Sequence, residues 1–232
     1  MLAAHAPVGA PSTWVLSNHD VTRTVTRYGR EDSSFAFATK RFGTPTDLAL
    51  GTRRARAAAL LSAALPGSLY IYQGDELGLP EVEDLPEGAR QDPMHFRSEG
   101  VDPGRDGCRV PLPWAGGRPP YGFSAGDTQP WLPQPHDWAQ YTVEHEASDP
   151  GSMLSLYRAA LALRRTLEGD EGFAWLESEP DVLCFARGGG FVNVTNLSDR
   201  PIDLPEHDSL LLGSTPLVDG QLPPDATAWL RT

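Results

Sequence analysis

The hydrophobic pattern starts with a short continuous run that ends abruptly in polar residues. Trp14-Val15-Leu16 is followed, after one serine, by Asn18-His19-Asp20. A continuous apolar run of this length, rather than an alternating one, is typical of a strand that is buried on both faces. The pattern therefore predicts a strand over residues 13–17 that carries a polar triplet at its C-terminal end.

The next two segments have the patterns of a helix and a second strand. Residues 48–65 are rich in Ala, Leu and Arg, and the break Pro66-Gly67 predicts that a helix ends there. Residues 68–72 are again apolar and precede Gln73-Gly74-Asp75-Glu76. Strand, helix and strand in this order predict a parallel α/β sheet with a right-handed crossover. Both polar segments are then expected at the same edge of the sheet.

The rest of the chain divides into three regions. Residues 78–150 hold most of the prolines and few periodic apolar positions, which predicts a long loop region, and its aromatic residues favour order. Helical spacing returns over residues 152–167. Short apolar runs then predict strands over residues 173–176, 182–186, 191–196, 210–212 and 227–230. We expect an α/β part over residues 1–168 and a small all-β sandwich domain over residues 169–232.

Composition and charge narrow the classes of partner. The 232 residues are 40% hydrophobic and 22% charged, which is ordinary for a globular protein. A net charge of -12 disfavours binding to nucleic acid and to anionic membranes. No apolar run approaches the ~20 residues of a membrane helix, and the first ten residues lack a secretory signal, so we expect a cytoplasmic protein. Cys108 and Cys184 are expected to be reduced.

Three motifs, in order along the chain, carry a resemblance to a known family. Residues 14–23 (WVLSNHDVTR) resemble the fourth conserved region of glycoside hydrolase family 13, in its α-glucosidase and oligo-1,6-glucosidase branch. Residues 66–78 (PGSLYIYQGDELG) are similar to the eighth barrel strand of that family and its exit, and residues 105–114 (RDGCRVPLPW) are a third match. The resemblance implies the last two strand–helix units of a (β/α)8 barrel, followed by the C-terminal β domain.

The resemblance also implies a function and roles for individual residues. It implies a retaining α-glycosidase for short α-glucosides, in which one aspartate is the nucleophile, a glutamate is the acid/base, and a second aspartate fixes the glucosyl ring. Only the last has a counterpart here, Asp20, which would stabilise the transition state by accepting hydrogen bonds from the 2- and 3-hydroxyls. His19 would donate to the same edge of the sugar, and Asn18 would orient its neighbours. Arg109 would hold sugar hydroxyls or a catalytic carboxylate, or else form a structural salt bridge within its loop.

The other polar and aromatic residues are assigned supporting roles or left open. Asp75 and Glu76 are adjacent, so their side chains are expected to point apart. The resemblance implies that their segment is a supporting turn. Four aromatic residues could form a stacking wall for glucose rings or simply pack the loops: Tyr72, Trp114, Trp131 and Trp138. No zinc, EF-hand, thiol-nucleophile or nucleotide-binding pattern is present, so we expect neither a metal nor a cofactor.

The resemblance places the nucleophile and the acid/base before the first residue of this chain. A whole barrel takes about 250 residues and eight strand–helix units, of which this sequence offers two. We therefore expect the C-terminal portion of a larger α-glucosidase that is inactive alone, whose partners are an α-glucosidic oligosaccharide or disaccharide and the missing N-terminal barrel portion. The alternatives are a non-catalytic carbohydrate-binding or interaction module, and one half of a split glycosidase. The sequence leaves the preference between α-1,4 and α-1,6 bonds open.

Overall fold

Contacts between residues divide the chain into two compact units. The computed structural model describes residues 6–34, 42–126, 128–167 and 172–232. Unit 1 comprises the described parts of residues 1–16, 53–70 and 156–232, and unit 2 comprises those of residues 17–52 and 71–155. The boundary expected after residue 168 stays a prediction, because this grouping follows contacts and not the order of the chain. The two units are described separately below.

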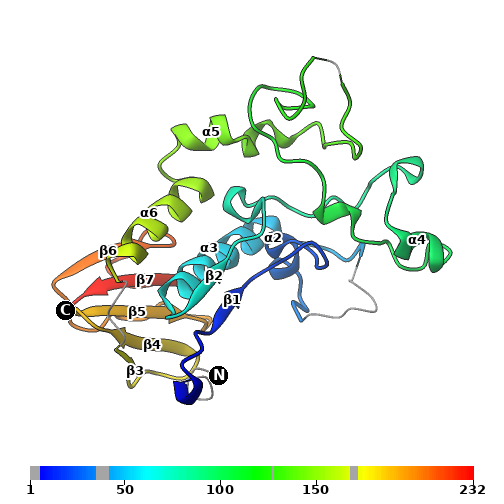
Figure 1. Cartoon of the computed structure of the whole chain (residues 1–232). Helices are drawn as coiled ribbons and strands as arrows, with labels where there is room; N and C mark the ends of the chain where they lie inside the picture. Colours follow the sequence, from blue (N-terminus) through cyan, green and yellow to red (C-terminus); the bar gives the residue numbers. More distant parts are fainter. Residues whose placement is uncertain (1–5, 35–41, 127, 168–171) are drawn as a thin grey trace. The chain divides into compact units, whose positions relative to one another are not determined.

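Unit 1 contains the two strands that were predicted to be parallel. Strands β1 (Thr13–Val15) and β2 (Ser68–Tyr70) form a two-stranded parallel sheet in which Trp14 lies opposite Leu69 (Figure 1). The indole nitrogen of Trp14 donates to the carbonyl of Pro66 over 2.7 Å. The prediction of a parallel α/β arrangement is therefore confirmed for these two strands.

The predicted helices α3 (Leu48–Ala64) and α6 (Met153–Thr166) are both present, within one or two residues of their expected ends. The Oδ1 atom of Asp47 caps the start of α3 by accepting from the backbone N–H of Leu50 over 2.9 Å. At the other end, the guanidinium of Arg164 donates to the carbonyl of Leu65 over 2.7 Å and also to those of Ala63 and Gly67. A side chain of α6 thus satisfies the carbonyls that the end of α3 leaves without helical partners.

The C-terminal strands form one antiparallel sheet in the order β3-β4-β5-β7-β6 (Figure 1). All five strands were predicted, and their bounds are β3 (Phe173–Trp175), β4 (Val182–Arg187), β5 (Phe191–Asn196), β6 (Ser209–Gly213) and β7 (Ala226–Arg231). On one face the hydroxyl of Thr227 donates to the carbonyl of Ala57 in α3 over 2.9 Å. This helix therefore packs on the sheet within unit 1.

The expected sandwich of two sheets differs from what the structure describes in this region. The other face of the five-stranded sheet is covered by the connections on either side of β6, which contribute Ile202 and Leu222 to a core with Val192 and Val194. These connections form only isolated bridges, between Ile202 and Leu222 and between Val218 and Gln221. They hold five prolines, which lack the N–H that a strand ladder needs, so no second sheet forms.

Unit 2 is an ordered loop region built around its own core. Three short helices punctuate it: α2 (Thr24–Tyr28), α4 (Pro93–Arg97) and α5 (Val143–Ser148). Single 3-10 turns are η1 (Ala6–Val8) in unit 1, and η2 (Asp75–Leu77), η3 (Glu87–Ala89), η4 (Asp106–Cys108) and η5 (Trp138–Tyr141) in unit 2. The core of unit 2 consists of Leu77, Leu79, Val82, Leu85, Val110, Tyr121, Leu132, Trp138 and Leu154. Two aromatic residues of this proline-rich stretch, Tyr121 and Trp138, are part of this core.

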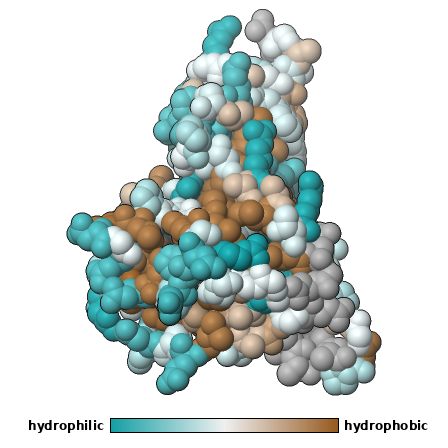
Figure 2. Space-filling model, turned by 90° about the vertical axis from the view of Figure 1, so that its left-hand side faces the viewer, coloured by the Kyte–Doolittle hydropathy of each residue, from teal (hydrophilic) through white to brown (hydrophobic). Residues whose placement is uncertain are grey.

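The surface mixes hydrophobic and hydrophilic residues. In the face drawn in Figure 2, brown hydrophobic areas are interrupted by teal hydrophilic residues. In the C-terminal sheet region the exposed large hydrophobic residues are Trp175, Leu176, Leu197, Leu210 and Val218. Among the described residues, no helix combines the length and the hydrophobicity needed to cross a membrane.

Candidate functional site

The loops that follow β1 and β2 are joined by one buried carboxylate. Asp75 accepts a hydrogen bond of 2.6 Å from the hydroxyl of Ser17 and one of 3.2 Å from the hydroxyl of Thr24. Burial raises the pKa of Asp75, although these hydrogen bonds and the charge of Arg23 act in the opposite direction. The neighbouring Glu76 turns back to accept from the N–H of Gly74 over 2.7 Å. Glu76 therefore bonds within the turn, whereas Asp75 ties the turn to the segment that follows β1.

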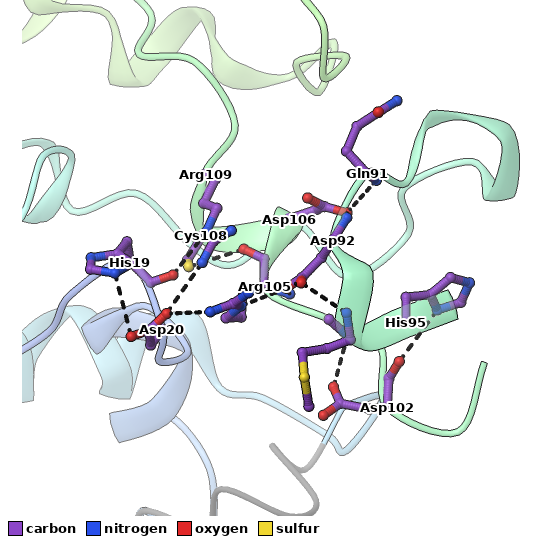
Figure 3. Close-up of polar contacts among 12 residues, drawn as sticks. His19, Asp20, Gln91, Asp92, His95, Asp102, Arg105, Asp106, Cys108 and Arg109 are labelled. Carbon is purple, nitrogen blue, oxygen red and sulfur yellow. Dashed lines mark hydrogen bonds and ion pairs between the residues drawn. The ribbon is translucent and has the colours of Figure 1, made fainter. Parts of the chain in front are cut away.

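The polar triplet forms a compact turn beside this support. The side-chain oxygen of Asn18 accepts from the backbone N–H of Asp20 over 2.8 Å, which fixes the backbone that carries the aspartate. The Nε2 atom of His19 lies 3.4 Å from Oδ2 of Asp20 (Figure 3). The side chain of Asp20 is 35% exposed and that of His19 is 67% exposed, so both remain accessible.

Two arginines converge on Asp20 from the third motif. The Nη1 atom of Arg105 donates to Oδ1 of Asp20 over 2.8 Å, and Nη2 of Arg109 donates to the same oxygen over 3.2 Å (Figure 3). Arg109 also donates through Nε to the carbonyl of His19 over 2.9 Å. The 3-10 turn η4 separates the two arginines, and this tight turn lets both side chains reach the triplet. The structure thus brings together all four predicted site residues: Asn18, His19, Asp20 and Arg109.

The charges around Asp20 keep it ionised. Burial alone would raise its pKa, but the hydrogen bond from Arg105 and the charges of His19, Arg105 and Arg109 hold it below the ordinary value. At neutral pH the side chain is therefore a carboxylate that can only accept hydrogen bonds. Its Oδ1 atom is shared by two guanidinium groups, whereas Oδ2 faces the accessible imidazole of His19.

Two residues of this cluster were missed in the sequence. The guanidinium of Arg105 binds Asp92 in a two-pronged pair, Nε to Oδ2 over 2.6 Å and Nη2 to Oδ1 over 2.9 Å. The side chain of Asp92 is fully buried, and the hydrogen bonds from Arg105 hold its pKa well below the usual range. Arg105 could have been found from its place in the third motif, four residues before Arg109. Asp92 offered only the signal of a helix cap before Pro93.

The four aromatic residues have different surroundings. Trp138 is buried in the core of unit 2, so the loop-packing alternative holds for this residue. The hydroxyl of Tyr72 donates to the carbonyl of Cys108 over 2.9 Å, which ties it to the turn between the two arginines. Trp114 and Trp131 are exposed and remain available for contact with a ligand.

No metal centre accompanies this cluster in the part of the chain that the structure describes. There, no three or more His, Cys, Asp or Glu side chains are grouped in a way that could hold a metal ion. The positive charges of Arg105 and Arg109 instead balance the negative charges of Asp20 and Asp92. What the cluster offers chemically is a preformed carboxylate acceptor next to an imidazole, a combination suited to the hydroxyl groups of a polyol.

Two curated proteins similar to this chain carry the names of glucosidases. The chain is 34% identical over 196 residues to a protein of Rhizobium meliloti (strain 1021) named "Probable alpha-glucosidase", covering 81% of this chain and 31% of that protein. It is 27% identical over 221 residues to the "Oligo-1,6-glucosidase" of Parageobacillus thermoglucosidasius, covering 83% and 35%. The chain thus spans about a third of the length of these curated relatives.

Solved structures and a family profile point in the same direction. The crystal structure of the alpha-glucosyl transfer enzyme XgtA matches 95% of this chain and 40% of its own, with a TM-score of 0.71 and 30% identity. The isomaltulose synthase of Klebsiella sp. LX3, at 20% identity and a TM-score of 0.68, shares the fold over 94% of this chain. The profile described as "Alpha amylase, catalytic domain" matches residues 3–169. A match over this much of the sequence shows that the chain belongs to the family of α-amylase catalytic domains.

Proposed function

We propose that this chain is the C-terminal portion of a retaining α-glucosidase for short α-glucosides, in which Asp20 holds the glucosyl ring during reaction. The observation that carries the proposal is the ionised, accessible carboxylate of Asp20, held by Arg105 and Arg109 where the segment after β1 begins. A family match that ends near the start of the C-terminal sheet supports the same assignment.

The chemistry of glucosyl transfer suits such a carboxylate. The ring passes through an oxocarbenium-like state, and hydrogen bonds to its hydroxyls that strengthen as the ring distorts lower the barrier. Asp20 accepts from the 2- and 3-hydroxyls, and His19 donates to the same edge of the ring. Asn18 supports this arrangement through its bond to the backbone of Asp20. Arg109 holds the carboxylate and the carbonyl of His19 together.

The nucleophile and the acid/base would come from a further barrel portion. Double displacement needs two carboxyl groups about 5–5.5 Å apart on either side of the scissile bond. In this proposal the chain supplies the last two strand–helix units, and the other units supply both reacting carboxyls. The portion that completes the barrel is either joined to this chain or encoded separately, as in a split enzyme.

The two-stranded sheet of unit 1 supports the need for such a partner. Parallel sheets occur almost only with both faces covered, and two isolated strands are at best marginally stable in water. In β1 and β2, however, Val15 is 48% exposed and Tyr70 is 65% exposed. Each strand pairs only with the other within the described residues. Further parallel strands of the same barrel, placed beside β1 and β2, would cover these side chains.

Activity measurements on the chain alone and with a complement test the proposal. The 232-residue chain is purified alone, and also coexpressed with the part of the R. meliloti relative that lies outside the matched stretch. We expect no hydrolysis of p-nitrophenyl α-glucoside, maltose or isomaltose by the chain alone, and hydrolysis by the copurified pair. The ratio of the hydrolysis rates for maltose and isomaltose gives the preference between α-1,4 and α-1,6 bonds.

Substitution of Asp20 makes the test specific. In the copurified pair, Asp20→Asn should lower kcat at least about 100-fold, because the charged acceptor is lost in the transition state. Asp84→Asn is the matched control, since it removes one exposed carboxylate of unit 2 and should leave kcat unchanged. Hydrolysis by the chain alone would contradict the proposal that the nucleophile and the acid/base come from another barrel portion. Sugar binding without hydrolysis by the pair would favour the carbohydrate-binding module instead.

A further inference from the structure

Arg105 joins two loops that lie far apart in the sequence. One guanidinium nitrogen, Nη1, donates to Asp20, and the other two, Nε and Nη2, donate to Asp92. The backbone N–H of Arg105 adds a bond of 2.7 Å to Oδ2 of Asp92. By contrast, the two bonds of the Arg109 guanidinium both go to the triplet, at His19 and Asp20. Arg105 is therefore the arginine that links the triplet to a second anchor.

That second anchor is itself rigidly held. The backbone N–H groups of Gln91 and Asp92 both donate to Oδ2 of Asp106, over 2.7 and 2.9 Å (Figure 3). The Oδ1 atom of Asp92 also accepts from the N–H of Met94 over 3.0 Å and so caps α4. A carboxylate with this many donors and no solvent exposure has one available position.

We propose that Asp92 is a positioning residue that acts through Arg105 to fix the carboxylate of Asp20. This inference rests on the proposed function, in which Asp20 contacts the glucosyl ring, and it adds a residue that does not touch the sugar. The two-pronged pair with Asp92 holds the Arg105 guanidinium in one plane, and this plane directs Nη1 at Asp20. A catalytic carboxylate gains from such support because small displacements reduce its effect on the transition state.

The titration of Asp20 separates positioning from simple charge repulsion. The charged groups that face Asp20 are His19, Arg105 and Arg109. Removing the negative charge of Asp92 would by itself lower the pKa of Asp20, because a nearby like charge disfavours the ionised form. Loss of a correctly aimed Arg105 would instead raise the pKa of Asp20 towards its ordinary value of 3.8. When the Asp92 charge is removed, a rise in the pKa of Asp20 therefore indicates positioning through Arg105, and a fall indicates charge repulsion alone.

The experiment is an NMR titration of the Asp20 side-chain carboxyl in the sugar-free 232-residue chain. Compared with the unchanged protein, Asp92→Asn should raise the titration midpoint of Asp20. Arg105→Lys should raise it too, because lysine keeps the charge but cannot bind both carboxylates in the same plane. In the double variant the midpoint should not rise above that of Arg105→Lys alone, since Asp92 can no longer aim the guanidinium and only its direct charge effect, whose removal lowers the pKa of Asp20, remains. Asp84→Asn, the control, should leave the midpoint unchanged.

The outcomes separate the inference from the proposed function. An unchanged or lower midpoint in folded Asp92→Asn, or additive shifts in the double variant, would overturn the positioning role. If Asp92→Asn does not fold, Asp92→Glu decides: it keeps the negative charge but displaces the two-pronged pair with Arg105, so a raised midpoint of Asp20 supports the positioning role and an unchanged one refutes it. Because no sugar is present, a failure of glucosidase activity in the reconstituted pair would leave this result untouched.

Discussion

The carboxylates of Asp20 and Glu81 respond to their surroundings in opposite directions. Arg105 and Arg109 hold the pKa of Asp20 low, whereas burial raises the pKa of Glu81 to about 7 despite the nearby charge of Arg23. An acid whose folded pKa exceeds its unfolded pKa destabilises the fold above the folded value and has no effect below the unfolded one. Glu81 should therefore reduce the stability of unit 2 at alkaline pH.

Replacing Glu81 with glutamine tests whether ionisation of Glu81 lowers the stability at alkaline pH. Glutamine keeps an acceptor for the N–H of Arg23, which donates to Glu81 over 2.8 Å, but it cannot ionise. We expect Glu81→Gln to raise the free energy of unfolding at pH 8 by about 3 kcal/mol and to leave it nearly unchanged at pH 4. Urea unfolding at both pH values measures the difference. Glu206→Gln, at an exposed position, is the control and should show no pH-dependent effect.

At the scale of elements, helices α2 and α3 approach each other at two glycines. A Cβ atom on Gly51 would lie 2.0 Å from the carbonyl oxygen of Val25, and one on Gly29 would lie 2.3 Å from that of Asp47. Both contacts are with backbone, which cannot move aside as a flexible side chain could. The absence of side chains at these positions therefore decides how closely the two helices can pack.

The substitution Gly51→Ala should destabilise the protein although it lies inside a helix. In an isolated helix alanine is favoured over glycine by about 1 kcal/mol. Here the clash with Val25 should outweigh that gain and lower the free energy of unfolding by about 1–3 kcal/mol. Thermal and urea unfolding measure the change. Gly88→Ala is the matched control, because open space surrounds that position; a stabilising effect at Gly51 would show that the helices can separate freely.

At the scale of the whole molecule, the uncovered side chains of β1 and β2 should make the isolated chain self-associate. Unpaired strand edges with apolar side chains are templates for pairing with another chain. We expect the apparent mass from light scattering to rise with concentration, and Val15→Lys or Tyr70→Lys to reduce that rise. Val218→Lys, which changes a residue that is 54% exposed in the C-terminal sheet region, should have little effect. A monomer at all concentrations would contradict the expectation.

The exposed side chains of β1 and β2 are expected to contact the complementary barrel portion as well as a second copy of the chain. If barrel strands from a complementary portion cover β1 and β2, coexpression with that portion should suppress the self-association of the chain. Val15→Lys should then also weaken copurification, because it places a charge where an apolar contact is expected. Retained copurification with this variant would place the contact surface elsewhere.

The sequence by itself determined the elements whose pattern is local. The continuous apolar run at β1, the Ala-rich stretch of α3 with its Pro66-Gly67 end, and the short runs of the C-terminal sheet each carry their own signal. The family motifs added Asp20, His19 and Arg109 as one group. Helix and strand propensities, caps and breakers act over a few residues, which is why these predictions succeeded.

Only the tertiary structure decided how distant segments combine. In the structure Arg105 binds Asp20, 85 residues away, and Asp92, 13 residues away. No periodic pattern of residues in the sequence predicts these side-chain contacts. The tertiary structure also covered the C-terminal sheet with prolyl connections instead of a second sheet. Such choices depend on which donors, acceptors and apolar faces meet once the chain is folded, and that is set by packing rather than by local propensity.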